Sequence, residues 1–266
     1  MITHLISIFK IFLLNKGIII TKVTSNDKLN MFFKRMKIFN TNKKLIRLGG
    51  NGDGGYCIPD DLNDVNFCFS PGVSNFAYFE EDLSKYGIKS FLADYSVNQA
   101  PTNNINLNFL KKFLGIINDE KNITLETWVN SNCSFNESDL ILQMDIEGCE
   151  YDILIDANIE LLKRFRIIII EFHDLQNIFN PIGFSNISKC FDKLLENFII
   201  VHAHPNNTLS SVKYQNYEVI PVIEFTFLRN DRITNMTPSL NFPHFLDKDC
   251  VKENKSIVLP KCWYNS

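Results

Sequence analysis

ILQMDIEGCE (141–150) and IIIIEFHDL (167–175) are the two stretches that decide the fold prediction. Each is an apolar run that ends abruptly in acidic residues, and the second run adds a histidine. The segment RIIIIEFH (166–173) is apolar almost throughout, which is the pattern of a central parallel strand covered on both faces. A buried strand has no structural need for carboxylates at its end. The two stretches therefore predict strands that lead into a polar site.

Apolar strands alternate with helical segments over most of the chain. Strands are predicted at 65–73, 88–96, 139–148, 166–173, 198–207 and 219–230, helices at 76–87, 151–165 and 186–198, an apolar segment at 107–118, and a short strand running into a helix at 123–131. This alternation predicts an open α/β sheet. The last two strands are joined only by SSVKYQNYE, which is too short for a crossover helix, so we expect antiparallel neighbours.

Three regions are expected along the chain of 266 residues. Residues 46–230 form the main domain, residues 1–45 form a helical N-terminal extension, and residues 231–266 form an irregular tail packed on the domain. Five apolar residues of the extension fall on one helical face: Leu5, Ile8, Phe9, Phe12 and Leu13. Packing on the domain or on the second copy of a homodimer is the preferred interpretation, and a shallow membrane-surface helix is the alternative.

Composition excludes several classes of protein. The net charge is −3 and the sequence pI is near 6.0, so the chain has no broadly basic surface for nucleic acid. Lysines interrupt the apolar N-terminus, and no apolar run reaches the ~20 residues of a transmembrane helix. Seven scattered cysteines without a C-x-x-C pair indicate neither a zinc knuckle nor a disulfide framework, and they fit a reducing cytoplasm.

Polar groups follow almost every predicted strand, where an open parallel sheet binds its ligands. These groups are SPGVS (70–74), DYS (94–96), DIEG (145–148), EFH (171–173) and HAHPNN (202–207). Gly72 lets the backbone pass close to a ligand, and Asp94 suits a ribose diol. An ordinary turn explains Gly72 equally well. The lack of a full G-x-G-x-x-G pattern argues against an NAD-type oxidoreductase.

A divalent cation of the Mg, Mn or Fe(II) type is predicted at the ends of the two opening strands. Asp145, Glu171 and His173 offer hard oxygen donors and one imidazole. Glu147 or Glu150 has the simpler role of beginning the next helix, and His173 alone fits a structural histidine equally well. As a group they fit a cation better, because neighbouring acids repel each other without one. His202 and His204 alternate, so both are expected on one strand face, where one could belong to the core and the other could reach the mouth of the site as a general base.

Five motifs together resemble the FkbM-like family of class I S-adenosylmethionine-dependent methyltransferases. They are IRLGGNGDGGYCIP (46–59), SPGVSNFAYFEEDL (70–83), LQMDIEGCEYDIL (142–154), IIEFH (169–173) and HAHPNN (202–207), and the resemblance covers about residues 45 to 230. It implies a Rossmann-like seven-stranded sheet, mostly parallel, with an antiparallel last strand and helices on both faces. Ser70 stands where the family's cofactor loop has an acid, and Ser74 stands where it has a second glycine.

The resemblance also implies the reaction and its residues. The cofactor is expected at Ser70, Gly72, Val73, Ser74, Asp94, Tyr95, Thr124 and Leu125, and catalysis at Asp145, His173 and His204. The implied reaction is methyl transfer to a hydroxyl of a nucleotide-linked sugar or a surface-glycan unit such as a capsule polysaccharide, with help from the metal. DGGY (53–56) is a candidate lid. A nitrogen or lipid-linked acceptor, or a non-catalytic binding module, is the alternative.

Overall fold

A seven-stranded sheet forms the centre of the protein, in a computed structural model that describes residues 2–265, with side chains from residue 4 onward. Residues 1 and 266 of the two predicted terminal regions lie outside the described part. The strand order is β11 (Phe198–Pro205), β14 (Ile223–Arg229), β10 (Phe165–Phe172), β9 (Leu140–Met144), β4 (Phe67–Pro71), β5 (Lys89–Ala93) and β6 (Leu107–Leu110). β14 runs antiparallel to both of its neighbours, β10 and β11, and the remaining neighbouring pairs of this sheet are parallel. The predicted Rossmann-like α/β fold is therefore confirmed.

The two opening stretches are the central strands β9 and β10. Every residue of both strands is buried, as their continuous apolar pattern predicts. They pair in parallel, and their register places Ile170 beside Met144. Met144 is the last residue of β9, and it pairs with Ile170, two residues before the end of β10. Asp145 and Glu171 therefore lie at the same level, at the carboxyl edge of the sheet.

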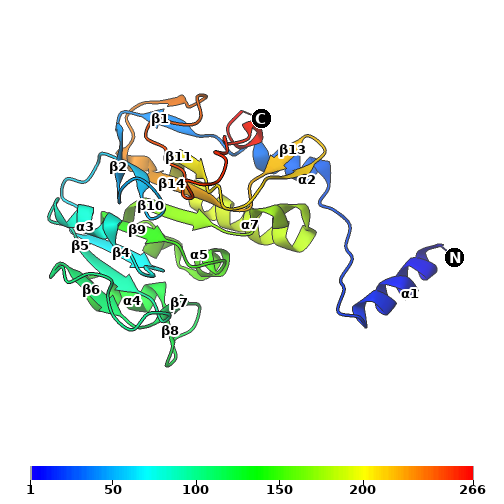
Figure 1. Ribbon diagram of the computed structural model, residues 1–266, viewed down its shortest axis with the longest axis horizontal. Helices are drawn as coiled ribbons and strands as arrows, with labels where there is room; N and C mark the ends of the chain where they lie inside the picture. Colours follow the sequence, from blue (N-terminus) through cyan, green and yellow to red (C-terminus); the bar gives the residue numbers. More distant parts are fainter. Residues whose placement is uncertain (1, 266) are drawn as a thin grey trace.

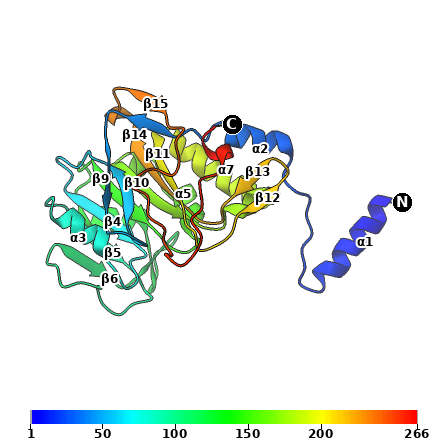
Figure 2. The ribbon, with the colours of Figure 1, turned by 45° about the horizontal axis from the view of Figure 1, so that its top comes forward.

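Helices cover both faces of the sheet (Figures 1 and 2). They are α3 (Tyr78–Ser84), α4 (Leu125–Asn132), α5 (Glu150–Asp156), α6 (Ile159–Leu162) and α7 (Pro181–Leu195). The single helix predicted at 151–165 is two helices, because Asn158 accepts a hydrogen bond from the backbone N–H of Glu160 and caps a new helix. α7 begins five residues earlier than predicted, since Asn180 caps it and Pro181 suits its first turn.

Short strand pairs extend the sheet domain. They are β1 (Phe39–Thr41) with β15 (Met236–Pro238), β2 (Leu45–Leu48) with β3 (Tyr56–Pro59), β7 (Phe113–Gly115) with β8 (Asn122–Thr124), and β12 (Val212–Tyr214) with β13 (Tyr217–Val219). The linker predicted to be a plain connection thus forms the β12–β13 hairpin. Three short 3₁₀ helices are η1 (Leu175–Phe179), η2 (Asn230–Arg232) and η3 (Lys261–Trp263).

Both terminal regions contribute to the main core. α2 (Asn26–Phe33) lies beside the C-terminal segment in both ribbon views (Figures 1 and 2). The rings of Phe32 and Phe33 are fully buried and meet Trp263 edge-on at centroid distances of 6.2 and 5.2 Å. The main core therefore continues beyond the boundaries expected at residues 45 and 231.

The predicted N-terminal helix forms as α1 (Ile2–Leu14), but it stands apart from the rest of the chain (Figures 1 and 2). Leu5, Ile8, Phe9 and Phe12 are each more than half exposed. The expected packing of this helix on its own domain is therefore not found in the described residues. Contact with a second copy or with a membrane surface stays a prediction. Within residues 2–265, no helix combines the length and hydrophobicity needed to cross a bilayer.

Candidate active site

A cavity of about 720 Å³ opens at the carboxyl ends of β4, β5 and β9. Its wall includes five residues predicted for the cofactor or for catalysis: Gly72, Val73, Ser74, Asp94 and Asp145. Residues of the predicted lid, Asp53, Gly54 and Tyr56, also line it. The cavity thus occupies the edge of the sheet where an open parallel sheet binds its ligands.

Gly72 lies where the chain after β4 passes close to the end of β9. It has φ +87°, and a Cβ atom at this position would lie 1.5 Å from the carbonyl oxygen of Asp145. Its own N–H donates to the Ala93 carbonyl at 3.0 Å. The glycine predicted to admit a ligand therefore also allows the exits of β4 and β9 to meet.

Asp94 stands at the end of β5, as predicted, and is 6% exposed. Its Oδ2 accepts a hydrogen bond from the Ser74 N–H at 2.9 Å. Its Oδ1 accepts from the N–H and the hydroxyl of Ser96, both at 2.7 Å. These contacts fix the carboxylate in the cavity wall and connect it to the loop that contains Gly72.

Ser70 lies beneath the cavity and not in its wall, so the structure does not support the predicted direct contact with the cofactor. Its hydroxyl hydrogen-bonds the carboxyl group of Glu80 and, at 2.6 Å, the amide oxygen of Gln143. Burial raises the pKa of Glu80, which lines the cavity. Glu80, an acid on α3, thus lies beside Ser70, the position on β4 where the family's cofactor loop has an acid.

The residues predicted near the adenine are also displaced from the wall. The Thr124 hydroxyl accepts from the Thr127 N–H and caps α4, while Leu125 is buried in the core. Tyr95 packs against the ring of Phe113 and does not line the cavity. The wall on this side comes instead from β7, the turn after it and β8, through the residues Phe113, Leu114, Gly115, Ile116, Ile117 and Asn122.

Asp145, Glu171 and His173 converge as predicted. Their candidate ligand atoms all lie within 4.8 Å of one another. His173 Nε2 is 3.8 Å from Asp145 Oδ1 and 3.7 Å from Glu171 Oε1. Asp145 Oδ1 and Glu171 Oε2 are buried without a hydrogen-bond partner in the described part of the chain. Two unpartnered carboxylate oxygens beside an imidazole fit the donor set of a divalent cation.

Glu150, expected mainly to begin a helix, also holds His173 in place. Its Oε1 lies 3.0 Å from His173 Nδ1 and accepts from the Gly148 N–H at 3.1 Å. A carboxylate at one ring nitrogen turns the other toward Asp145 and Glu171, as in many metal sites. Although burial opposes it, the Glu150 hydrogen bond and charge raise the pKa of His173 to about 9. Burial raises the pKa of Glu171 to about 8.

His204 lies outside the cavity wall, so the structure does not support its predicted role as a base in contact with substrate. It is 4% exposed, and its Nδ1 lies 3.5 Å from Asp247 Oδ2 in the C-terminal tail. His202, on the same face of β11, lies 2.8 Å from Asp247 Oδ1. The two alternating histidines thus share a face, as predicted, but this face meets the tail.

The predicted lid is held by Arg47. Its guanidinium donates to the carbonyls of Gly50 at 2.7 Å and Gly52 at 2.9 Å. A Cβ atom on Gly49 would lie 2.2 Å from the Gly54 carbonyl, so the loop folds tightly back on itself. This brings Asp53 and Gly54 into the cavity wall, whereas movement of the loop stays a prediction.

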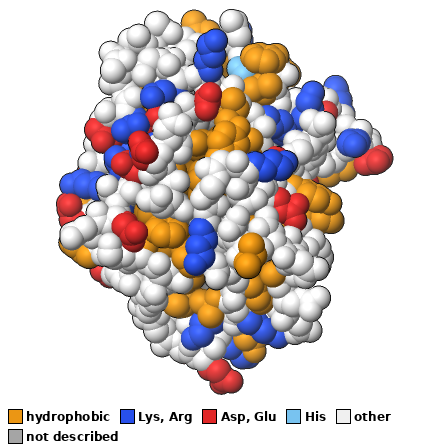
Figure 3. Space-filling view, turned by 90° about the vertical axis from the view of Figure 1, so that its left-hand side faces the viewer, with side chains coloured by type: hydrophobic (Ala, Val, Ile, Leu, Met, Phe, Trp, Pro, Cys, Tyr) orange, Lys and Arg blue, Asp and Glu red, His pale blue; other side chains and the backbone are white. Residues whose placement is uncertain are grey.

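Apolar side chains surround the cavity, a feature that the sequence patterns did not indicate. Phe76, Tyr78, Ile116 and Ile117 line it and are each at least half exposed. The face that carries α3 shows hydrophobic patches with acidic and basic side chains interspersed around them (Figure 3). The sequence did contain one signal that Glu80 is buried. Glu80 stands between Phe79 and Leu83 in the sequence of α3, and both of these apolar residues pack inward.

Comparison with known families agrees with this geometry. Residues 80–188 match the family model of the methyltransferase FkbM domain, a span that includes Asp94, Asp145, Glu171 and His173. Over this span the chain is similar to FkbM-like methyltransferases. The sheet of the chain also has the antiparallel strand, β14, that the resemblance implied.

Solved structures share only a distant likeness with this chain. A proposed RNA methyltransferase from Pyrococcus horikoshii is 7% identical, with a TM-score of 0.31, over 63% of this chain and 77% of that one. Magnesium protoporphyrin IX methyltransferase from Synechocystis is 11% identical in two structures. The structure with bound SAH has a TM-score of 0.33 and covers 64% of this chain and 76% of that one. The structure with bound SAM has a TM-score of 0.29 and covers 64% of this chain and 72% of that one. None of the curated proteins matches the chain.

Proposed function

We propose that the protein transfers a methyl group from S-adenosylmethionine to a hydroxyl of a sugar, with help from a divalent cation. The observation that carries this proposal is the convergence of Asp145, Glu171 and His173 beside the cavity, with unpartnered carboxylate oxygens. Oxygen-rich donor sets of this kind favour Mg²⁺ or Mn²⁺. Asp145 also lines the cavity, so the metal set and the space for substrate meet at this residue.

The cofactor would lie along the exits of β4 and β5. Gly72 and Ser74 would approach its methionine part, and Asp94 would accept hydrogen bonds from its ribose. Glu80 would provide the carboxyl group that position 70 lacks, since it hydrogen-bonds Ser70 and lines the cavity. The apolar residues Leu114 and Ile116 would cover the adenine, in place of the predicted Thr124 and Leu125.

The chemistry requires positioning and the removal of one proton. S-adenosylmethionine supplies a methyl group already activated by its sulfonium, and a bound divalent cation would lower the pKa of the acceptor hydroxyl. The hydroxyl oxygen forms the new C–O bond, the C–S bond breaks, and the products are a methyl ether and S-adenosylhomocysteine. Asp145 takes the hydroxyl proton because it lines the cavity, and His173 Nε2 lies 3.8 Å from its Oδ1.

A lipid-linked sugar is the second candidate acceptor. It is favoured by the exposed apolar residues around the cavity, such as Phe76 and Ile117, and by the exposed apolar helix α1. A free nucleotide sugar would not need such a surface. The two candidates share the same reaction and differ in what carries the sugar.

The test is transfer of a labelled methyl group to a panel of nucleotide sugars and lipid-linked sugars. We expect turnover that EDTA abolishes and Mg²⁺ or Mn²⁺ restores. Activity that is insensitive to EDTA would exclude metal assistance, and calorimetry without S-adenosylhomocysteine binding would exclude the transferase altogether. Methylation of amines but not hydroxyls in the same panel would identify a nitrogen acceptor.

A further inference from the structure

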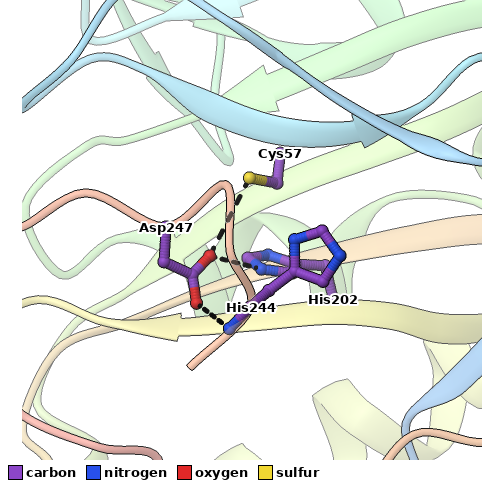
Figure 4. Close-up of side chains that lie close together, drawn as sticks. All are labelled: Cys57, His202, His244 and Asp247. Carbon is purple, nitrogen blue, oxygen red and sulfur yellow. Dashed lines mark hydrogen bonds and ion pairs between the residues drawn. The ribbon is translucent and has the colours of Figure 1, made fainter. Parts of the chain in front are cut away.

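A second group of metal-ligating side chains lies outside the active-site wall. It consists of Cys57 on β3, His202 on β11, and His244 and Asp247 in the C-terminal tail (Figure 4). Their candidate ligand atoms all lie within 4.8 Å of one another. Three segments that are distant in sequence thus bring a thiol, two imidazoles and a carboxylate together.

The distances suit a small tetrahedral site. Asp247 Oδ1 lies 2.8 Å from His202 Nε2 and 3.9 Å from Cys57 Sγ. Zinc bonds of about 2.0–2.3 Å place neighbouring tetrahedral ligand atoms roughly 3.3–3.8 Å apart. These two separations lie within about half an ångström of that range, and all candidate ligand atoms lie within 4.8 Å of one another.

The second oxygen of Asp247 has partners of its own. Oδ2 accepts from the His244 backbone N–H at 2.7 Å and lies 3.5 Å from His204 Nδ1. This keeps Oδ1 directed at Cys57 and His202 (Figure 4). The His244 ring is held by the Leu246 N–H, which donates to Nδ1 at 3.3 Å. Supporting contacts of this kind are what orient the ligands of a metal site.

Burial differs among the four residues in a way that suits an enclosed site with one entrance. Cys57 and His202 are 2% and 3% exposed, and the Asp247 side chain is 5% exposed. His244 is half-buried and lines a separate cavity of about 290 Å³ beside β1 and β2. An ion could therefore reach the group past His244, and the other three ligands would then hold it away from water.

We propose that Cys57, His202, His244 and Asp247 bind one zinc ion that fastens the C-terminal tail to the sheet. A thiolate with two imidazoles and a carboxylate is a borderline-soft set that favours zinc over Mg²⁺. Four protein ligands leave no open position, so the site is structural. The simpler alternative is a metal-free hydrogen-bond network centred on Asp247. That network needs the histidines but gains little from the Cys57 thiol, which lies 3.9 Å from Asp247 Oδ1. Cys57 therefore distinguishes the zinc site from the hydrogen-bond network.

Cobalt substitution tests the proposal without any assay of methyl transfer. The full chain is stripped with a chelator and titrated with Co²⁺. We expect about one equivalent to produce a thiolate-to-cobalt charge-transfer band and the visible bands of a tetrahedral ion, both removed by zinc. The Asp145, Glu171 and His173 group contains no thiol, so it cannot produce the charge-transfer band.

Two variants and a matched control identify the ligands. Cys57→Ser should abolish the charge-transfer band, and His244→Ala, at the half-buried position, should weaken cobalt binding at least tenfold. Cys250→Ser changes another cysteine of the tail and should keep the band. A missing band in the wild-type protein, or a band kept by Cys57→Ser and lost by Cys250→Ser, overturns the proposal.

Proteolysis of the wild-type chain gives a readout that does not depend on the folding of any variant. Lys248, Lys252 and Lys255 are exposed trypsin sites in the same tail. Chelation should accelerate cleavage there at least severalfold, and zinc, but not Mg²⁺, should restore protection. Equal cleavage rates in chelator and in zinc would show that no ion fastens the tail.

Discussion

The α-carbon of Gly72 lies so close to the backbone of Asp145 that a single added carbon would overlap the carbonyl oxygen, at 1.5 Å. The loop after β4 and the end of β9 therefore have no room between them for a side chain. Gly72 also adopts φ +87°, which other residues rarely adopt. The positions of the predicted cofactor loop and of Asp145 thus depend on each other.

Gly72→Ala should lower the free energy of unfolding by about 2–4 kcal/mol, because backbone strain and overlap add together. It should also remove S-adenosylhomocysteine binding, since the loop must move away from Asp145. Urea denaturation and calorimetry measure the two effects. Gly87→Ala is the matched control, with φ +80° but no atom within 4 Å of the added carbon. It should cost only about 1–2 kcal/mol, and equal losses in both variants would contradict the overlap argument.

Asp94→Asn should weaken S-adenosylhomocysteine binding by about 10- to 100-fold, the loss expected when charge-assisted hydrogen bonds to a ribose become neutral. The amide oxygen can still accept from Ser96, but the NH₂ group would face the Ser74 N–H, so the thermal unfolding temperature should fall by a few degrees. Calorimetry and a thermal melt check the two outcomes. Asp60→Asn, at an exposed position, is the control. Unchanged affinity in Asp94→Asn would mean that the ribose lies elsewhere.

Glu150→Gln should lower kcat by about 10- to 100-fold with little change in stability, because the uncharged amide no longer orients His173 as firmly. Steady-state kinetics with the best acceptor measure the effect. The exposed Glu160→Gln is the control and should keep the wild-type rate. If Glu150→Gln is as active as the wild type, Glu150 only begins its helix, which was the simpler expectation from the sequence.

Asp145→Asn should lower turnover by at least about 100-fold, the usual contribution of a positioned proton acceptor. The affinity for S-adenosylhomocysteine should stay within about threefold of the wild type, since Asp94 and the loop after β4 are unchanged. Calorimetry and the methyl-transfer assay separate these effects. A variant that keeps its turnover, or that loses cofactor affinity as strongly as activity, would place Asp145 outside the catalytic set.

Acid should destabilise the protein through Asp61. This carboxylate is 5% exposed and hydrogen-bonds Arg232 at 2.8 and 3.0 Å and Lys43 at 2.7 Å. Burial by itself would raise the pKa of Asp61, but these hydrogen bonds outweigh it and lower the pKa to about 2. The contribution of the ionised Asp61 side chain to the free energy of unfolding is therefore complete above about pH 4, and it is lost as the pH falls from about 4 to 2.

Asp61→Asn tests this dependence. We expect a loss of about 1–2 kcal/mol at neutral pH, since Lys43 and Arg232 are partly exposed to solvent. The difference between variant and wild type should shrink toward zero as the pH approaches 2. Urea denaturation at a series of pH values measures both curves. Parallel curves down to pH 2 would mean that Asp61 has an ordinary pKa.

The sequence predicts both the sheet and the convergence of the polar residues at the ends of β9 and β10, and it does so for one physical reason. Continuous apolar runs such as 166–173 identify buried parallel strands, and parallel strands end at the same edge. Asp145, Glu171 and His173 therefore had to lie near each other. The apolar cavity wall formed by β7, β8 and the turn between them could not be predicted in this way, because the sequence of the turn has no regular apolar pattern. The position of Glu80 depends on the packing of α3 against Ser70, which residue spacing along the strand does not indicate.

His202 marks the limit of prediction from local patterns. Its place on one face with His204 follows from the alternation of a strand. Its partners Cys57 and Asp247 lie about 145 residues before it and 45 residues after it. A search for closely spaced cysteine pairs cannot find such a group, because the ligands meet only after three segments have folded together.

The contact between Phe32 and Trp263 determines when folding can be completed. About 230 residues separate the two rings. Phe184, Phe191 and Tyr217 cover part of the Phe32 and Phe33 rings, but the part that Trp263 covers stays exposed to water until the far segment has been synthesised. A nascent or truncated chain that lacks Trp263 therefore exposes part of the Phe32 and Phe33 rings as an apolar surface of the kind that chaperones bind. Reporter fusions placed after residue 230 would therefore be expected to aggregate, whereas fusions that preserve Trp263 should remain in solution.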